Sequence, residues 1–262
     1  MVFYFSATGN SLYVAKMLNT NAVSIPQIIH KKNCSFQDET IGIVCPSYGG
    51  EPPQMVKEFL QKEEFHCSYF YIVMTYGASI EIAASNMRKL MEECRISAAY
   101  FNTVQMPDNY LPGFDMQQEM RKNLDADKQI QAIQRDIAER KKFWKEPSAE
   151  DVKVYEDYQK FIQAHPEQSW RNITFHVEET CIGCGICSRV CPAGCIRVEN
   201  GKAVYHETSE CQHCMACIHS CPQKAVGLSI PEVNRDARYR NEHISLQELM
   251  NANQQRAGKS TN

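Results

Sequence analysis

Eight cysteines in the last third of the chain repeat one spacing twice. Two-residue gaps separate the first three cysteines of each copy, a three-residue gap precedes the fourth, and a proline follows it. Such a loop wraps three thiolates around one face of an iron–sulfur cube, and its fourth cysteine binds a neighbouring cube. A repeat of this kind indicates one unit built from two similar halves. The two copies are Cys181, Cys184, Cys187, Cys191 and Pro192, and then Cys211, Cys214, Cys217, Cys221 and Pro222.

The exchange of fourth cysteines defines two ligand sets. Cluster one takes Cys181, Cys184, Cys187 and Cys221, and cluster two takes Cys211, Cys214, Cys217 and Cys191. Structural zinc is the alternative, but zinc sites commonly use two separated C-x2-C pairs for each ion. Three cysteines at two-residue steps before a Cys-Pro, occurring twice without a matching pair of histidines, favour two [4Fe-4S] clusters.

The remaining cysteines and two histidines receive no ligand role. The chain has 13 cysteines, an odd number that cannot all form disulfides with each other. Cys195 is predicted to be a small packing residue, with a reactive thiol as the alternative. His213 and His219 lie inside the second copy, and we expect them to be solvated or to neighbour the ligands. The other thiols, Cys34, Cys45, Cys67 and Cys94, show no pattern.

A hydroxyl-rich loop near the N-terminus is the second candidate site. Residues 1–6 form an apolar run typical of a buried parallel strand, and an apolar helical stripe begins at Leu12. Between them, backbone N–H groups and a helix N-terminus would face an anion. The loop has neither the lysine of a Walker motif nor the three glycines of a dinucleotide site. It therefore suits the single phosphate of FMN, with an ordinary strand–helix turn as the alternative. Its residues are Ser6, Ala7, Thr8, Gly9, Asn10 and Ser11.

Two more predicted strands end in loops that could hold a flavin ring. Residues 40–45 and 69–74 are strand candidates, residues 98–104 form a fourth strand, and residues 22–29 form a weaker edge strand. Helices alternate with these strands, which predicts an α/β fold with a doubly wound parallel sheet. Ligands of such sheets lie beyond the carboxyl ends of the strands, where Tyr48 could stack on the ring. The two loops contain Pro46, Ser47, Tyr48, Gly49 and Gly50, and then Thr75, Tyr76 and Gly77.

These motifs resemble known families. Residues 1–112 resemble flavodoxins through the S-x-T-G-N-S loop and Tyr48-Gly49-Gly50, which implies FMN and a five-stranded sheet of order 2-1-3-4-5. Residues 172–228 resemble bacterial two-cluster ferredoxins, which implies a small α+β domain. The whole chain resembles flavodoxin–ferredoxin fusion proteins of anaerobic bacteria, which carry the segment seen here from Met106 to Tyr110. The resemblance places Asn109 and Tyr110 beside the flavin, and a plain polar loop is the alternative.

Composition sets the domain organisation. We predict a flavodoxin-like domain over residues 1–146, a helical linker over 147–171, a ferredoxin domain over 172–228 and a tail over 229–262. The linker helix carries an aromatic face that we expect to pack between the domains. The tail arginines are expected to be solvated, with packing of the tail back on the first domain as the alternative. The net charge of −3 offers no case for nucleic acid. No secretory signal and no apolar run of about 18 residues is present, so we expect a cytoplasmic protein without a membrane span.

The expected function is electron transfer between FMN, two [4Fe-4S] clusters and an external redox partner, which would be a ferredoxin, a reductase or another oxidoreductase. Two alternatives stay open: a reductase that passes electrons from the clusters through the flavin to a small-molecule acceptor, and a redox sensor without turnover. Neither a Ser-His-Asp arrangement nor a pair of catalytic carboxylates can be assigned. Whether this oxidoreductase-type chain is an enzyme therefore stays open, and no residue is predicted to be catalytic.

Overall fold

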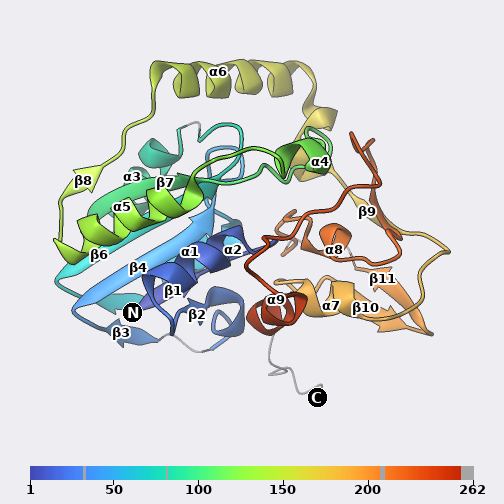
Figure 1. The fold of residues 1–262 in the computed structure, drawn as a ribbon, viewed down its shortest axis with the longest axis horizontal. Coiled ribbons are helices and arrows are strands. Elements are labelled where there is room, and N and C mark those ends of the chain that lie inside the picture. The colour runs from blue at the N-terminus through green and yellow to red at the C-terminus, as the bar shows by residue number, and fades with distance from the viewer. Residues whose placement is uncertain (32–33, 81, 207–209, 255–262) are drawn as a thin grey trace.

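A parallel sheet forms the centre of the N-terminal half in this computed structural model, which describes all residues except 32–33, 81, 207–209 and 255–262. Its strand order is β2-β1-β4-β6-β7-β8 (Figure 1), and all neighbouring strands are parallel. The predicted α/β class and the order 2-1-3-4-5 are confirmed, and β8 is an added edge strand that the sequence did not predict. The strands are β1 (Val2–Tyr4), β2 (Val23–Ser24), β4 (Thr40–Pro46), β6 (Tyr69–Tyr76), β7 (Ala98–Gln105) and β8 (Phe143–Trp144).

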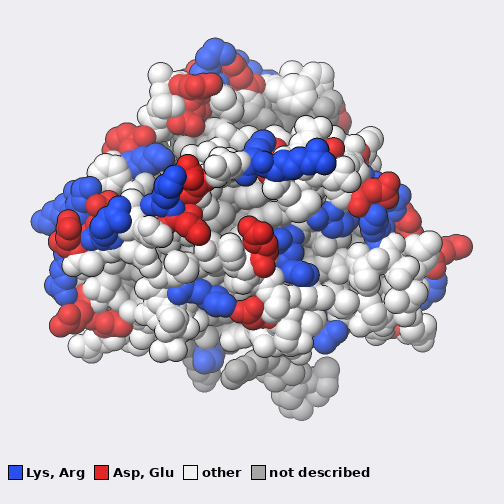
Figure 2. Space-filling model, viewed as in Figure 1, with Lys and Arg blue, Asp and Glu red and all other residues white. Residues whose placement is uncertain are grey.

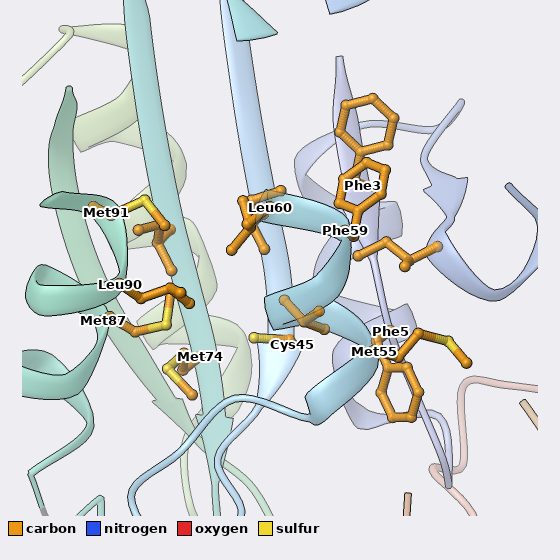
Figure 3. Close-up of a cluster of buried hydrophobic side chains, with 14 of the residues drawn as sticks. Phe3, Phe5, Cys45, Met55, Phe59, Leu60, Met74, Met87, Leu90 and Met91 are labelled. Atoms are coloured by element: carbon orange, nitrogen blue, oxygen red, sulfur yellow. The ribbon is translucent and has the colours of Figure 1, made fainter. Parts of the chain in front are cut away.

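Helices cover both faces of this sheet. Figure 3 shows one buried layer, in which Phe59 and Leu60 of α2 and Met87 and Leu90 of α3 pack on the strands. On the opposite face, α1 and α5 contribute apolar side chains to a second layer. This two-sided burial explains the nearly continuous apolar sequence of the strands. The helices are α1 (Asn10–Leu18), α2 (Gln54–Lys62), α3 (Ala83–Glu93) and α5 (Ala126–Ala138).

The cysteine-rich region is built from two short antiparallel pairs and two short helices. Asn200 and Gly201 have φ angles of 49° and 77° at the turn between β10 and β11. Two positive φ angles are the signature of the type I′ hairpin that the Asn-Gly pair predicts. The elements are β9 (Phe175–Val177), β10 (Ile196–Glu199), β11 (Lys202–Tyr205), β12 (Val226–Leu228), α7 (Ile186–Val190) and α8 (Ala216–His219).

Helix α6 (Ala149–Ala164) crosses above the two halves of the molecule (Figure 1). Ser148 and Asp151 form the predicted capping box at its start. None of its residues is fully buried, but the predicted aromatic face is half-buried at Val152, Tyr155, Tyr158 and Ile162. The helix spans the surface and covers a cavity described below. The remaining elements are β3 (Ser35–Gln37), β5 (Glu64–His66), α4 (Met116–Glu119) and the 3-10 helices η1 (Ile25–Gln27), η2 (Pro166–Gln168) and η3 (Trp170–Asn172).

The described part of the C-terminal tail returns to the sheet. Its helix α9 (Leu246–Asn253) packs against α7 and η1. The Asn253 side chain donates hydrogen bonds to the carbonyl oxygens of Ser6 at 2.9 Å and Val190 at 3.1 Å. Arg238 is mostly buried and forms an ion pair of 2.7 Å with Glu232, so the expectation of a solvated arginine is wrong here. The tail therefore ties the first strand of the sheet to the cysteine-rich region.

Charged side chains of both signs are interspersed on the face shown in Figure 2. The described residues include no helix with the length and apolar character needed to cross a membrane.

Candidate functional site

The four cysteines assigned to cluster one line a single small cavity, although Cys221 comes from the second copy of the motif. Two backbone N–H groups donate to the Cys181 sulfur, from Gly183 at 3.5 Å and from Ala203 at 3.4 Å. Ala225 donates in the same way to the Cys221 sulfur at 3.2 Å. Such N–H···S bonds favour thiolates and tune the potential of a bound cluster. The cysteines and their donors thus fit an iron–sulfur cube.

The cysteines assigned to cluster two line another cavity, and Cys191 reaches it from the first copy. Cys195 lies in the same wall and is 1% exposed. A hydrogen bond from the Cys195 side chain lowers the pKa of both Cys191 and Cys211. The backbone N–H of Cys195 also donates to the Cys191 sulfur at 3.2 Å, so Cys195 contacts a predicted ligand of cluster two. Within the described residues, no three His, Cys, Asp or Glu side chains converge tightly enough to hold a single metal ion.

Two glycines of the first motif give a matched test of the cluster-one loop. Gly183 and Gly185 have φ angles of 67° and 73°, so an alanine would be strained at either position. A Cβ on Gly183 would also lie 2.1 Å from the backbone oxygen of Gly201, whereas one on Gly185 would meet only Val198 at 3.6 Å. We expect Gly183→Ala to lower the iron content from about eight to about four per chain.

Gly185→Ala is the control: Gly185 lines the cluster-one cavity, but its Cβ would meet no backbone atom. This variant should keep both clusters, at a stability cost of about 1–2 kcal/mol. Iron analysis and visible absorption of anaerobically purified protein measure the difference. Equal iron in the two variants would show that the close approach to Gly201 does not shape the cluster site.

A cavity of about 360 Å³ opens where β1, β4, β6 and β7 end. The structure brings together nearly all the residues predicted to bind FMN; Gly9 and Gly50 are the two that do not line the cavity. This volume lies in the range of pockets that hold small molecules and cofactors. The predicted residues that line it are Ser6, Ala7, Thr8, Asn10, Ser11, Pro46, Ser47, Tyr48, Gly49, Thr75, Tyr76, Gly77, Asn109 and Tyr110.

Hydroxyl groups cluster at the deep end of this cavity. Ser11 and Thr75 share a hydrogen bond of 2.8 Å between their hydroxyl oxygens, and Asn109 Nδ2 donates to Thr8 Oγ1 at 2.6 Å. In the described residues, the buried Ser47 Oγ and Tyr48 hydroxyl have no hydrogen-bond partner. Buried polar groups rarely stay unpaired, so these two atoms fit a ligand that carries polar groups. The site therefore suits FMN.

Other cavity-lining residues were missed by the sequence reasoning. Asp108 accepts hydrogen bonds from the backbone N–H groups of Ala78 at 3.0 Å and Tyr110 at 2.9 Å. Burial raises the pKa of its carboxyl group. Asp108 lies within the Met106–Tyr110 segment that the family resemblance already singled out, so that segment was the available signal. The missed residues are Ser79, Val154, Tyr158, Trp170, His213, Cys214 and Met215, whereas Ala78, Pro107, Asp108 and Phe114 line the cavity within or beside the predicted loops.

Cys214 and Met215 line both the large cavity and the cluster-two cavity. Next to them, the ring of Trp170 lies 6.3 Å from that of Tyr48 and 5.9 Å from that of His213. His213 is thus packed at the junction and is not simply solvated. The proposed flavin site and the cluster-two site therefore share a wall that contains a predicted cluster ligand.

Comparisons with known proteins identify the cysteine-rich region. Residues 180–225 match the model of the 4Fe-4S dicluster domain. An uncharacterised ferredoxin of Methanocaldococcus jannaschii is 33% identical over 66 residues, which are 24% of this chain and 86% of that protein. Through this domain, the chain belongs to the 4Fe-4S dicluster ferredoxins.

Two further similarities were found, one to a protein of known sequence and one to a solved structure. One component of the ion-translocating oxidoreductase complex of Methanosarcina acetivorans is 47% identical over 51 residues, 20% of this chain and 19% of that protein. The chain thus matches about a fifth of that relative. The Trp repressor binding protein of Bacillus subtilis, a solved structure, is 11% identical with a TM-score of 0.31 and covers 51% of this chain and 96% of that one.

Proposed function

We propose that this protein transfers electrons between an external redox partner, two [4Fe-4S] clusters and FMN, in that spatial order. The observation that carries the proposal is the wall formed by Cys214 and Met215, which line both the cluster-two cavity and the large cavity. The dicluster ferredoxin domain and its ferredoxin relatives support electron transfer. When bound, the clusters would exchange single electrons and FMN one or two.

The chain's own residues would set the spacing of these carriers. Cys214 would hold cluster two, and it also lines the large cavity together with Tyr48 and Trp170. Because both sites belong to one chain, transfer between them needs no diffusional encounter. The half-buried aromatic side chains of Tyr48 and Trp170 at the junction would limit the access of water to the gap between the sites.

Cluster one would be the point of exchange with a partner protein. Cys184 is exposed, and the adjacent Ile182 is 62% exposed, which is unusual for an isoleucine. The cluster-two cavity shares Cys214 and Met215 with the large cavity, whereas the cluster-one cavity shares no lining residue with it, so cluster two would lie between them. A partner that contacts Ile182 would therefore reach cluster one first.

Anaerobic purification and stopped-flow reduction test the proposal. We expect about eight iron and eight sulfide per chain and stoichiometric FMN, either bound on purification or after titration. A reduced low-potential ferredoxin should bleach the cluster absorbance first and the flavin absorbance afterwards. Zinc in place of iron, or no FMN binding at any concentration, would contradict the proposal.

Reduction of a small molecule at the flavin is the second candidate function. It is favoured by the wall of the large cavity that Phe114, Val154 and Tyr158 form outside the predicted FMN loops. These side chains come from the segment before α4 and from α6, which has no buried residue. Turnover of an added small acceptor, with a rate that changes on Tyr158→Ala, would favour this function over a carrier.

A further inference from the structure

A buried histidine connects the second cysteine motif to the proposed phosphate loop. His219 lies between the predicted ligands Cys217 and Cys221 and is 7% exposed. Its Nε2 is 2.9 Å from the carbonyl oxygen of Asn109, and the Asn109 side chain in turn donates to Thr8 Oγ1 at 2.6 Å. Thr8 is itself buried in the loop. Two hydrogen bonds therefore join the cluster region to the loop.

The partners of His219 define its tautomer. Its Nδ1 lies 3.1 Å from the backbone nitrogen of Tyr239, which can only donate. Nδ1 is therefore the acceptor, and Nε2 must carry the proton that is donated to the Asn109 carbonyl. The ring is fixed from both sides, so its orientation does not depend on a cofactor.

Tyr239 extends the connection along a second route. Its hydroxyl donates to Asn10 Oδ1 at 2.6 Å, and Asn241 Nδ2 donates to the same oxygen at 3.2 Å. The backbone nitrogen of Asn241 also donates to the Thr8 carbonyl oxygen at 2.9 Å. Asn10, Tyr239 and Asn241 are all buried. The loop is thus held by the tail on one side and through Asn109 on the other, and His219 contacts both supports.

We propose that His219 is a positioning residue that holds the phosphate loop through Asn109 in the arrangement that binds FMN, and so couples the flavin site to the second cysteine motif. This inference rests on the proposed function, because it assumes that the loop binds FMN. His219 lines neither the large cavity nor the cluster-two cavity. Its effect on FMN must therefore pass through Asn109 or Tyr239.

Two substitutions of His219 test its hydrogen bonds to Asn109 and Tyr239 separately. The amide of His219→Gln can place a donor near the position of Nε2 and keep the bond to Asn109. The shorter amide of His219→Asn can accept from Tyr239, as Nδ1 does, but does not reach Asn109. We expect His219→Asn to weaken FMN binding about tenfold, the size of one buried hydrogen bond left unmade. His219→Gln should stay within about threefold of the unsubstituted protein.

The measurement is the FMN dissociation constant of the full chain with its clusters, from quenching of flavin fluorescence under anaerobic conditions. Iron content and thermal unfolding are recorded for every variant, and His176→Asn, an exposed histidine in β9, is the control. A double-mutant cycle combines His219→Asn with Asn109→Ala. Because His219 is proposed to act on the loop through the Asn109 side chain, the double variant should bind FMN no more weakly than Asn109→Ala alone.

The outcomes are distinct. FMN binding by the unsubstituted protein, with equal affinities for His219→Asn and His219→Gln, would overturn this inference and leave the proposed function standing. Additive effects in the cycle would overturn it as well. Failure of the unsubstituted protein to bind FMN would overturn both.

Discussion

Replacing Cys214 with serine is expected to remove cluster two and to disconnect the flavin site from cluster one. A hydroxyl is a poor substitute for a thiolate on iron, so the iron content should fall from about eight to about four per chain. Cys214 also lines the large cavity, so the cluster that it would hold is the one next to the proposed flavin site. Reduction of the flavin by an external ferredoxin should then fall to the background rate, while cluster one is still reduced. Iron analysis and stopped-flow absorbance measure both effects.

Cys94→Ser is the matched control for Cys214→Ser. Cys94 is partly buried at the end of α3 and lines neither cluster cavity. We expect its replacement to leave the iron content and the flavin reduction rate unchanged. Normal flavin reduction in Cys214→Ser, despite the loss of four iron atoms, would show that electrons reach the flavin without cluster two.

The grouping of the proposed cluster ligands could be predicted from the sequence because their spacing is local. Gaps of two and three residues dictate which thiols share a cube, including the exchange of Cys191 and Cys221 between copies, and the two cavities gather these same sets. The parallel direction of the strands was predictable because they alternate with helices, whereas their order came from the resemblance to flavodoxins. Strand β8 was not predictable, because its two residues show no periodicity.

The parts of the site that depend on contacts between distant segments could not be predicted. Val154 and Tyr158 reach the large cavity from a helix whose pattern indicated domain packing. Apart from its position in a cysteine motif, nothing in the sequence singled out His219. Its hydrogen-bond partners, Asn109 and Tyr239, lie 110 and 20 residues away along the chain. Arg238 was expected to be solvated because a sequence does not show which carboxylate a folded tail places beside it.

Replacing Gly9 with alanine is expected to destabilise the protein and to weaken FMN binding together. Gly9 has a φ of 103°, a conformation that costs an alanine about 1–3 kcal/mol. Its Cβ would lie 3.0 Å from Asn241 Cβ and 3.1 Å from Ile244 Cβ, so the tail must move or the loop must open, at a further cost of about 1–3 kcal/mol. The free energy of unfolding should therefore fall by about 2–6 kcal/mol, measured by urea denaturation.

Gly201→Ala separates backbone strain from the contact with the tail. Gly201 has a φ of 77°, yet a Cβ there would meet no atom within 4 Å, so only the strain of about 1–2 kcal/mol applies. Because Gly201 lies in the β10–β11 hairpin, its replacement should leave FMN affinity unchanged. If Gly9→Ala is no less stable than Gly201→Ala and binds FMN equally well, the contact of the tail with residues 6–11 does not stabilise that loop. A larger loss for Gly9→Ala in both measurements would mean that residues 241–244 belong functionally to the flavin site, although they lie far from it in sequence.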